Sequence, residues 1–140
     1  MRNRIVPVVL LVMALLAATT AQAGKPESGK TEEQQLVGDW RGDSICVVRP
    51  SACNDEKALY HVKKREGPNA YSLQADKIVD GKAEMMGTAE CTYAPEKHVL
   101  TCTRPNLVLQ LNLNDKSLNG TMNRPDGTLW RNITLKKDGA

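Results

Sequence analysis

Few side chains in this sequence are of the kinds that act as acids, bases or nucleophiles. The chain has two histidines, His61 and His98, and a histidine is the usual general base beside a nucleophilic serine. No motif places either histidine next to a serine. We interpret both histidines as ordinary strand residues. The sequence therefore favours a protein that is not an enzyme and predicts no catalytic residue. The serines considered as possible nucleophiles beside a histidine are Ser44, Ser51, Ser72 and Ser117.

Two acidic clusters offer carboxylate oxygens, which are the ligands that hard cations prefer. One cluster is Asp55-Glu56, and the other contains Asp80 and Glu84. Neither has the ligand spacing of a calcium-binding loop, and the chain has no glycine-rich phosphate-binding loop. We interpret both clusters as solvated loops. The sequence therefore predicts no metal site and no cofactor.

The four cysteines are the clearest chemical feature of the chain. A zinc site would need tighter spacing, whereas six residues lie between Cys46 and Cys53 and ten lie between Cys91 and Cys102. A two-residue loop at 96–97 would place Cys91 directly opposite Cys102 in a hairpin, close enough for a disulfide. Cys46 then pairs with Cys53 by elimination, although four cysteines allow three pairings.

The N-terminus has the layout of a secretory signal peptide. Arg2 and Arg4 precede an apolar run that begins at Ile5 and ends at about Ala18, and a small-x-small triplet follows at 21–23. The run is short for a membrane span, which needs about 20 apolar residues; an uncleaved anchor is the alternative. We expect cleavage after Ala23 and a secreted or periplasmic protein without a membrane span. Its compartment would allow disulfides to form.

Cleavage would also remove most of the net charge. The full chain has 19 basic and 16 acidic residues, a net charge of +3. Without Arg2 and Arg4, 17 basic residues stand against 16 acidic ones, which leaves +1. A nucleic-acid-binding protein needs a basic patch, and the run Lys63-Lys64-Arg65 is too short to form one. We therefore expect no nucleic-acid partner.

The remaining chain of about 117 residues is long enough for one domain. Residues 24–35 are polar, and we expect a flexible leader that becomes ordered only near its end, with one helical turn at 33–37. Residues 36–137 contain a series of short strands separated by turn signals. The predicted strands span 39–49, 58–65, 70–79, 85–93, 98–104, 106–113, 117–124 and 128–136.

The C-terminal half specifies its own strand register. Leucines alternate with other residues over 107–113, which indicates a strand with one buried face. A two-residue turn at 115–116 and a second at Asp126-Gly127, with Pro125 paired to Thr128, keep the apolar residues on one face of three strands. The predicted pairs are Leu113 with Leu118, Leu111 with Gly120, Leu109 with Met122, Leu118 with Leu135, Gly120 with Ile133 and Met122 with Arg131.

About eight consecutive hairpin strands, with no helix to cover a sheet face, predict an all-β fold. We expect a small antiparallel up-and-down β-barrel, stabilised by disulfides, with a tight sandwich as the alternative. The chain has no phenylalanine, two tryptophans and three tyrosines. A barrel of eight strands is just wide enough to be filled by side chains or to hold one small ligand.

Gly38-Asp39-Trp40, followed by Gly42, resembles the Gly-x-Trp signature on the first strand of lipocalins and related calycin-type barrels. The resemblance implies a structural role for Gly38 and Trp40, with Trp40 closing one end of the barrel. It also implies that an arginine of the last strand lies across the indole, and Arg131 is the matching residue. The mature domain resembles small secreted bacterial proteins of lipocalin-like architecture without a settled activity. It lacks the helix that packs beside classical lipocalin barrels.

The tetrapeptide Arg41-Gly42-Asp43-Ser44 matches a cell-adhesion motif, which works only when it is displayed at a loop tip. Here it lies along a strand in which Trp40, Gly42, Ser44 and residue 46 share one face. We expect Arg41 and Asp43 to form a surface charge pair rather than a receptor ligand.

The first functional hypothesis is a non-enzymatic, monomeric binding protein that holds a small, largely apolar ligand in the barrel. Apolar burial would supply the affinity at about 25 cal/mol per Å², and one or two polar groups would orient the ligand. The predicted lining residues are Tyr60, Tyr71, Leu73, Leu109, Leu111, Met122 and Ile133.

The alternative hypothesis is a protein-binding module, such as an inhibitor of a secreted enzyme. The loop closed by Cys46 and Cys53 would then be a rigid contact surface that includes Arg49 and Pro50. A catalytic barrel is a third and weaker hypothesis. An interior cavity of several hundred Å³ would favour the first hypothesis, and a filled interior with an exposed apolar or basic rim would favour the second.

Overall fold

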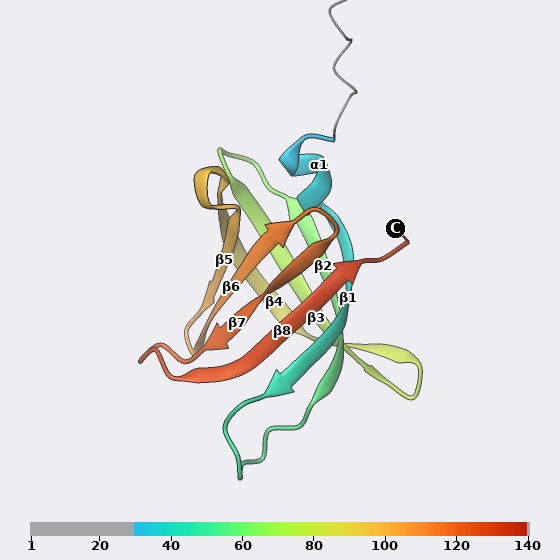
Figure 1. Ribbon diagram of the computed structural model, residues 1–140, viewed down its shortest axis with the longest axis vertical. Helices are drawn as coiled ribbons and strands as arrows, with labels where there is room; N and C mark the ends of the chain where they lie inside the picture. Colours follow the sequence, from blue (N-terminus) through green and yellow to red (C-terminus); the bar gives the residue numbers. More distant parts are fainter. Residues whose placement is uncertain (1–29, 140) are drawn as a thin grey trace, which may run out of the picture.

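The computed structural model describes residues 30–139, which form one short α-helix, a 3₁₀ turn and eight strands (Figure 1). The predicted signal peptide, 1–23, and residues 24–29 of the predicted leader lie outside the described residues. No helix of the described part is long and apolar enough to cross a membrane. The elements are α1 (Glu32–Leu36), β1 (Gly38–Cys46), β2 (Glu56–Lys64), β3 (Ala70–Val79), β4 (Lys82–Ala94), η1 (Pro95–Lys97), β5 (Val99–Arg104), β6 (Leu107–Asn114), β7 (Ser117–Asn123) and β8 (Leu129–Lys137).

The strands form a closed barrel in which each strand pairs with the next along the chain. All pairs are antiparallel, and β8 pairs with β1 to close the barrel. The predicted all-β, up-and-down barrel of about eight strands is therefore confirmed. Closure leaves no strand edge along most of the sheet, which is how such barrels avoid edge-to-edge association.

The predicted register of the last three strands is confirmed, including Leu113 opposite Leu118 and Met122 opposite Arg131. The turn between β7 and β8 differs from the prediction. The Arg124 amide donates to the Thr128 carbonyl at 2.9 Å, and the register shifts after Met122, so Pro125 does not pair with Thr128. A three-residue turn with a bulge replaces the two-residue loop, and the bulge restores the register of the inner pairs.

Both predicted disulfides are present. Cys91 lies directly opposite Cys102, and this bridge links β4 to β5 inside the core. The other bridge joins Cys46 to Cys53 and closes the connection between β1 and β2. Two disulfides in a domain of this size are compatible with an oxidising compartment.

One end of the barrel is covered by α1 (Figure 1), and Trp40 is buried against this helix. Trp40 is fully buried, as is Leu36, and the indole Nε1 donates to the Leu36 carbonyl at 2.9 Å. The cation over the indole is Lys137, whose Nζ lies 4.5 Å from the ring centroid. The same Nζ donates to the Gln35 carbonyl, so β8 is tied to α1.

The expectation that Arg131 lies over Trp40 is therefore wrong. In the β1–β8 register, Trp40 pairs with Lys137, whereas Arg131 pairs with Cys46, six positions further along. Six strand residues span roughly 20 Å, so Arg131 lies near the opposite end of the barrel. Arg131 and Lys137 both point inward because they are separated by an even number of residues.

The adhesion-like tetrapeptide lies along β1 and is not displayed at a loop tip. Gly42 is required there because a Cβ at this position would lie 2.0 Å from the Thr134 carbonyl oxygen on β8. Arg41 pairs with Asp138 at 3.1 Å, and Asp43 pairs with Lys57. The expected Arg41–Asp43 pair is not formed, because each side chain finds a partner across the barrel surface.

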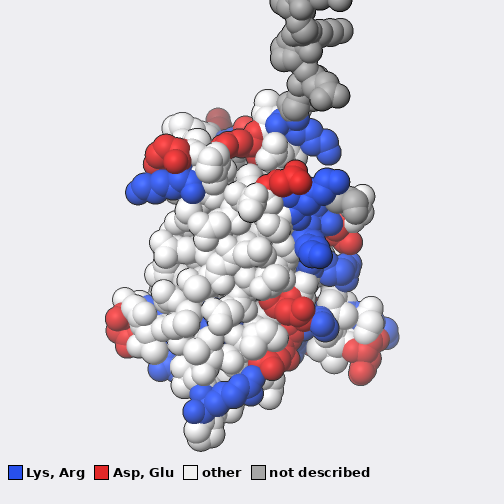
Figure 2. All heavy atoms as spheres, in the orientation of Figure 1, with Lys and Arg blue, Asp and Glu red and all other residues white. Residues whose placement is uncertain are grey.

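The end opposite α1 carries two projections, the β1–β2 loop and the tip of the β3–β4 hairpin (Figure 1). Met85 and Met86 on this hairpin are exposed, at 67% and 40%. Figure 2 shows a broad face without charge in the middle of the barrel, with Lys, Arg, Asp and Glu gathered towards its ends and one side. The outward residues of β6 and β7 are accordingly uncharged, including Gln110, Asn112 and Thr121.

Candidate functional site

A cavity of about 200 Å³ lies inside the barrel at the end opposite α1, and we call it the mouth cavity. The connections β1–β2, β3–β4, β5–β6 and β7–β8 surround this end. The mouth cavity combines an apolar floor with a charged rim. Its lining residues are Ser44, Glu56, Tyr60, Leu73, Ala75, Met86, Gly87, Thr88, Ala89, Arg104, Leu107, Leu109, Met122 and Arg131.

Strand alternation explains why charged side chains face inward at this end. On β5, Leu100 and Cys102 are buried, so Arg104 belongs to the same face two residues later, at the end of the strand, where it is exposed. On β2, buried Tyr60 and Ala58 place Glu56 on that face in the same way. Inward positions near α1 are therefore mostly apolar, with Lys137 over Trp40 as an exception, whereas charged inward residues are added to the apolar ones at the mouth.

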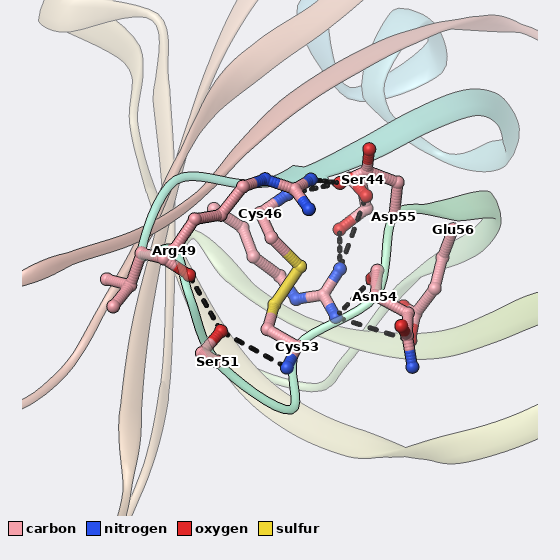
Figure 3. Close-up of polar contacts among 10 residues, drawn as sticks. Ser44, Cys46, Arg49, Ser51, Cys53, Asn54, Asp55 and Glu56 are labelled. Carbon is pink, nitrogen blue, oxygen red and sulfur yellow. Dashed lines mark hydrogen bonds and ion pairs between the residues drawn. A yellow bond between two sulfur atoms is a disulfide. The ribbon is translucent and has the colours of Figure 1, made fainter.

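Arg131 is buried at the rim, with 8% of its surface exposed. Its Nη1 donates to the Ser44 hydroxyl at 3.0 Å and to the Ser44 carbonyl at 3.2 Å. Its Nη2 donates to the Asn54 carbonyl at 3.0 Å and lies 3.3 Å from Glu56 Oε1. Figure 3 shows how Ser44, Asn54 and Glu56 converge there. The charge of Arg131 is thus compensated within the protein.

Tyr60 is a lining residue of the mouth cavity and has a buried hydroxyl. The side chain is fully buried, and its Oη has no hydrogen-bond partner. Ser44 lies close enough to affect the hydroxyl but forms no hydrogen bond of normal geometry with it. Burial raises the pKa of Tyr60 to about 12, against the opposing effect of the Arg131 charge. The hydroxyl is therefore protonated at neutral pH and is available as a donor.

Arg104 is the second guanidinium of the mouth cavity, and it lies against Gly87. A Cβ at position 87 would lie 2.2 Å from Arg104 Nη1, so a larger residue there would displace the guanidinium from this placement. Arg104 forms no ion pair within residues 30–139. Two guanidinium groups and one carboxylate line the mouth cavity, which gives its lining a net charge of +1.

The structure brings four of the seven predicted ligand residues together in the mouth cavity: Tyr60, Leu73, Leu109 and Met122. The other three, Tyr71, Leu111 and Ile133, are buried in the core outside the cavity lining. Side chains fill the half of the barrel near α1, where the rings of Tyr71 and Tyr93 meet edge to face at 6.2 Å. The role of the seven residues as ligand contacts stays a prediction.

Sequence reasoning missed the rim residues Ser44, Glu56 and Arg104 as parts of a site. The sequence did contain the pattern that identifies Arg104 as an inward residue. In the predicted strand 98–104, Arg104 lies two residues after Cys102 and therefore on the same face. Glu56 was harder to find, since the predicted strand began at residue 58 and β2 begins at Glu56. Arg131 was correctly placed inward but was assigned to the wrong end of the barrel.

A wider groove of about 640 Å³ adjoins the mouth cavity and shares Leu107 and Met122 with it. It lies between the β5–β6 and β7–β8 turns and is lined by Trp130 and Arg124. The Arg124 guanidinium stacks on the Trp130 ring at 3.9 Å from the centroid. The groove extends the space that a bound molecule could occupy towards solvent.

The disulfide-closed loop beside the mouth is held by several polar contacts (Figure 3). Asp55 accepts from the Cys46 amide at 2.9 Å and pairs with Arg49 at 2.5 Å. The Ser51 hydroxyl donates to the Val48 carbonyl at 2.7 Å and accepts from the Cys53 amide. The loop is therefore ordered although its tip is exposed.

Neither histidine lines the mouth cavity. His98 pairs with Glu32 at 2.7 Å near α1. His61 lies on the outer face of β2 between two carboxylates, with Nδ1 2.6 Å from Asp39 and Nε2 3.1 Å from Asp76. Asp76 is buried and also accepts from Gln74. No group of three or more metal-ligating side chains occurs within residues 30–139.

His61 is expected to make folding stability depend on pH. Partial burial disfavours the charged ring, but the hydrogen bonds and charges of Asp39 and Asp76 outweigh it and raise the pKa of His61 above 6.5. A raised pKa in the folded state means that this stabilisation is complete below pH 6.5 and is lost as the pH rises through the folded pKa. Urea denaturation at pH 5–9 should show this loss.

The matched variant for this measurement is His61→Gln, which keeps a polar side chain but cannot titrate. The difference in unfolding free energy between wild type and His61→Gln should shrink as the pH rises above 6.5. A difference that is constant across this range would show that His61 is not protonated between its two carboxylates.

No protein-family model, curated protein or solved structure matches this chain in sequence or fold comparisons. The functional proposals below therefore rest on the sequence and the structure of this chain alone.

Proposed function

We propose that this protein is a secreted, non-enzymatic binding protein that holds a small, largely apolar ligand in the mouth cavity. The observation that carries the proposal is a cavity of about 200 Å³ at the end of the barrel that α1 leaves open. Apolar side chains form its floor, and a few polar groups converge at its rim, which is the usual composition of a small-molecule site. The signal-like N-terminus and the two disulfides support secretion.

The volume of the mouth cavity limits the size of the ligand. A cavity of about 150 Å³ holds benzene, whereas drug-sized ligands need roughly 300–1,000 Å³. A single ring or a short alkyl chain therefore fits the 200 Å³ of the mouth cavity. A longer molecule would extend into the adjoining groove, past Leu107 and Met122.

Filling the mouth cavity should abolish binding without unfolding the protein. Ala89 is a partly buried lining residue on β4, and Ala89→Phe would place a ring in the cavity. Native mass spectrometry of wild-type protein, purified from its own cells, is expected to show a bound small molecule that Ala89→Phe lacks. Overpacking is expected to cost about 1–3 kcal/mol of stability.

The matched control is Thr92→Phe, three residues further along β4 on the exposed outer face. It adds the same ring outside the barrel and should retain the ligand. A ligand retained equally by both variants would place binding elsewhere. Wild-type protein without any bound small molecule would contradict the proposal.

The second candidate function is a protein-binding module that uses the loop from Cys46 to Cys53. It is favoured by the order of this loop together with its exposure, since 42% of Val47 is exposed and the Arg49 side chain is half exposed. Under this alternative, a secreted partner protein would bind wild type and Ala89→Phe equally, and Val47→Asp would abolish that binding.

A further inference from the structure

We propose that the ligand of the mouth cavity carries a carboxylate, which is bound by the guanidinium of Arg104 and the hydroxyl of Tyr60. This inference rests on the function proposed above, because it names the chemical class of the ligand in the same cavity. Three properties of the lining lead to it: an uncompensated charge, an unpaired donor and an apolar floor.

The charge without an ion-pair partner belongs to Arg104, which is exposed at the rim of the mouth cavity. The two guanidinium groups of the lining differ, because Glu56 lies 3.3 Å from Arg131 and no carboxylate within residues 30–139 pairs with Arg104. The Arg104 guanidinium occupies the space that a Cβ at position 87 would otherwise take. A guanidinium presents parallel N–H donors that match the two oxygens of a carboxylate. An anion from outside the protein would therefore complete this site.

The unpaired donor is the hydroxyl of Tyr60. A buried polar group without a partner reduces stability, and such groups are rare in folded proteins. Tyr60 is a lining residue of the mouth cavity, and its hydroxyl, which is buried near Ser44, has no hydrogen-bond partner of normal geometry within the described residues. A carboxylate oxygen is an acceptor only, so it suits a protonated phenol. Bound ligand would therefore supply the hydrogen bond that the free protein lacks.

The apolar floor excludes a bare inorganic anion as the best ligand. Leu73, Leu109 and Met122 lie beneath the rim and are the residues that bury apolar surface. A carboxylic acid with a small apolar body would satisfy both parts of the cavity at once. Benzoate and hexanoate have the required size and charge.

Calorimetric titration of the full mature protein at pH 7 tests this inference with benzoate and hexanoate as probes. Benzamide and hexanamide are the neutral partners, with nearly the same shape and no charge. Each acid is expected to bind at least about tenfold more tightly than its amide, because charge-assisted hydrogen bonds are the stronger kind.

Two variants test the contributions of the Arg104 guanidinium and the Tyr60 hydroxyl separately. Arg104→Gln is expected to remove the preference for the acid over the amide. Tyr60→Phe is expected to weaken acid binding about fivefold, since it removes one hydrogen bond, while its stability stays equal to or above that of wild type because the hydroxyl is unpaired. The control is Arg65→Gln, the same change at the β2–β3 turn outside the cavity, which should leave binding unchanged.

The possible results separate this inference from the proposed function. Equal binding of acids and amides would overturn the carboxylate site and leave a neutral-ligand function intact. Failure of all four probes, with a natural ligand still lost in Ala89→Phe, would also overturn the carboxylate class alone. If none of the four probes binds and the purified wild-type protein carries no ligand, both the carboxylate site and the proposed binding function are overturned. A Tyr60→Phe variant that is less stable than wild type would show that the hydroxyl serves the fold.

Discussion

Replacing Trp40 with alanine is expected to lower the free energy of unfolding by about 3–5 kcal/mol, the range for large aromatic side chains deleted from a core. The indole is fully buried at the closed end of the barrel. Its removal leaves a cavity, leaves the Leu36 carbonyl without its donor, and removes the ring beneath Lys137. Urea denaturation followed by far-ultraviolet circular dichroism measures the change.

The control for this experiment is Trp130→Ala, because Trp130 is the other tryptophan and lies partly exposed on β8. It is expected to cost about 1 kcal/mol, since the ring is already partly exposed and stacks on the flexible Arg124 side chain. Equal losses for the two variants, or a loss below about 1 kcal/mol for Trp40→Ala, would contradict the role of Trp40 in closing the barrel.

Removal of the Cys91–Cys102 disulfide by a double substitution to alanine is expected to cost about 3–4 kcal/mol. The bridge closes a loop with a sequence separation of 11, which in the chain-entropy description is worth about 3 kcal/mol. Both sulfurs also pack in the core, where Cys102 is fully buried, so truncation adds a packing loss. Thermal and urea denaturation of the purified variants measure the effect.

The comparison is the double alanine variant of Cys46 and Cys53. Its loop has a sequence separation of 7 and lies at the surface, so the expected cost is about 2 kcal/mol. This variant should mainly loosen the loop beside the mouth. A larger loss here than for the Cys91–Cys102 bridge would show that the mouth loop, rather than the β4–β5 hairpin, limits the stability of the barrel.

Hairpin pairing was predictable from the sequence because its partners are close in the chain. Alternating leucines and a short turn leave one register that keeps Leu113 opposite Leu118 on the buried face. The same reasoning placed Cys91 opposite Cys102. The β7–β8 turn was less predictable, since a bulge adds one residue to a turn without changing the alternation pattern beyond it.

The sequence by itself determined which residues face inward, because side chains of a strand alternate between its two faces. It identified Trp40 as an inward residue of β1 and Arg131 as an inward residue of β8. It also predicted both disulfides correctly, since local geometry brings Cys91 and Cys102 together and leaves the other two as partners.

Only the tertiary structure decided how far along the barrel each inward residue lies. The closing register between β1 and β8 joins segments about 90 residues apart, and no local pattern sets it. That register places Lys137 over Trp40 and sends Arg131 to the mouth. The mouth cavity exists for the same reason, because closure brings Arg104 and Tyr60 from separate strands to one space.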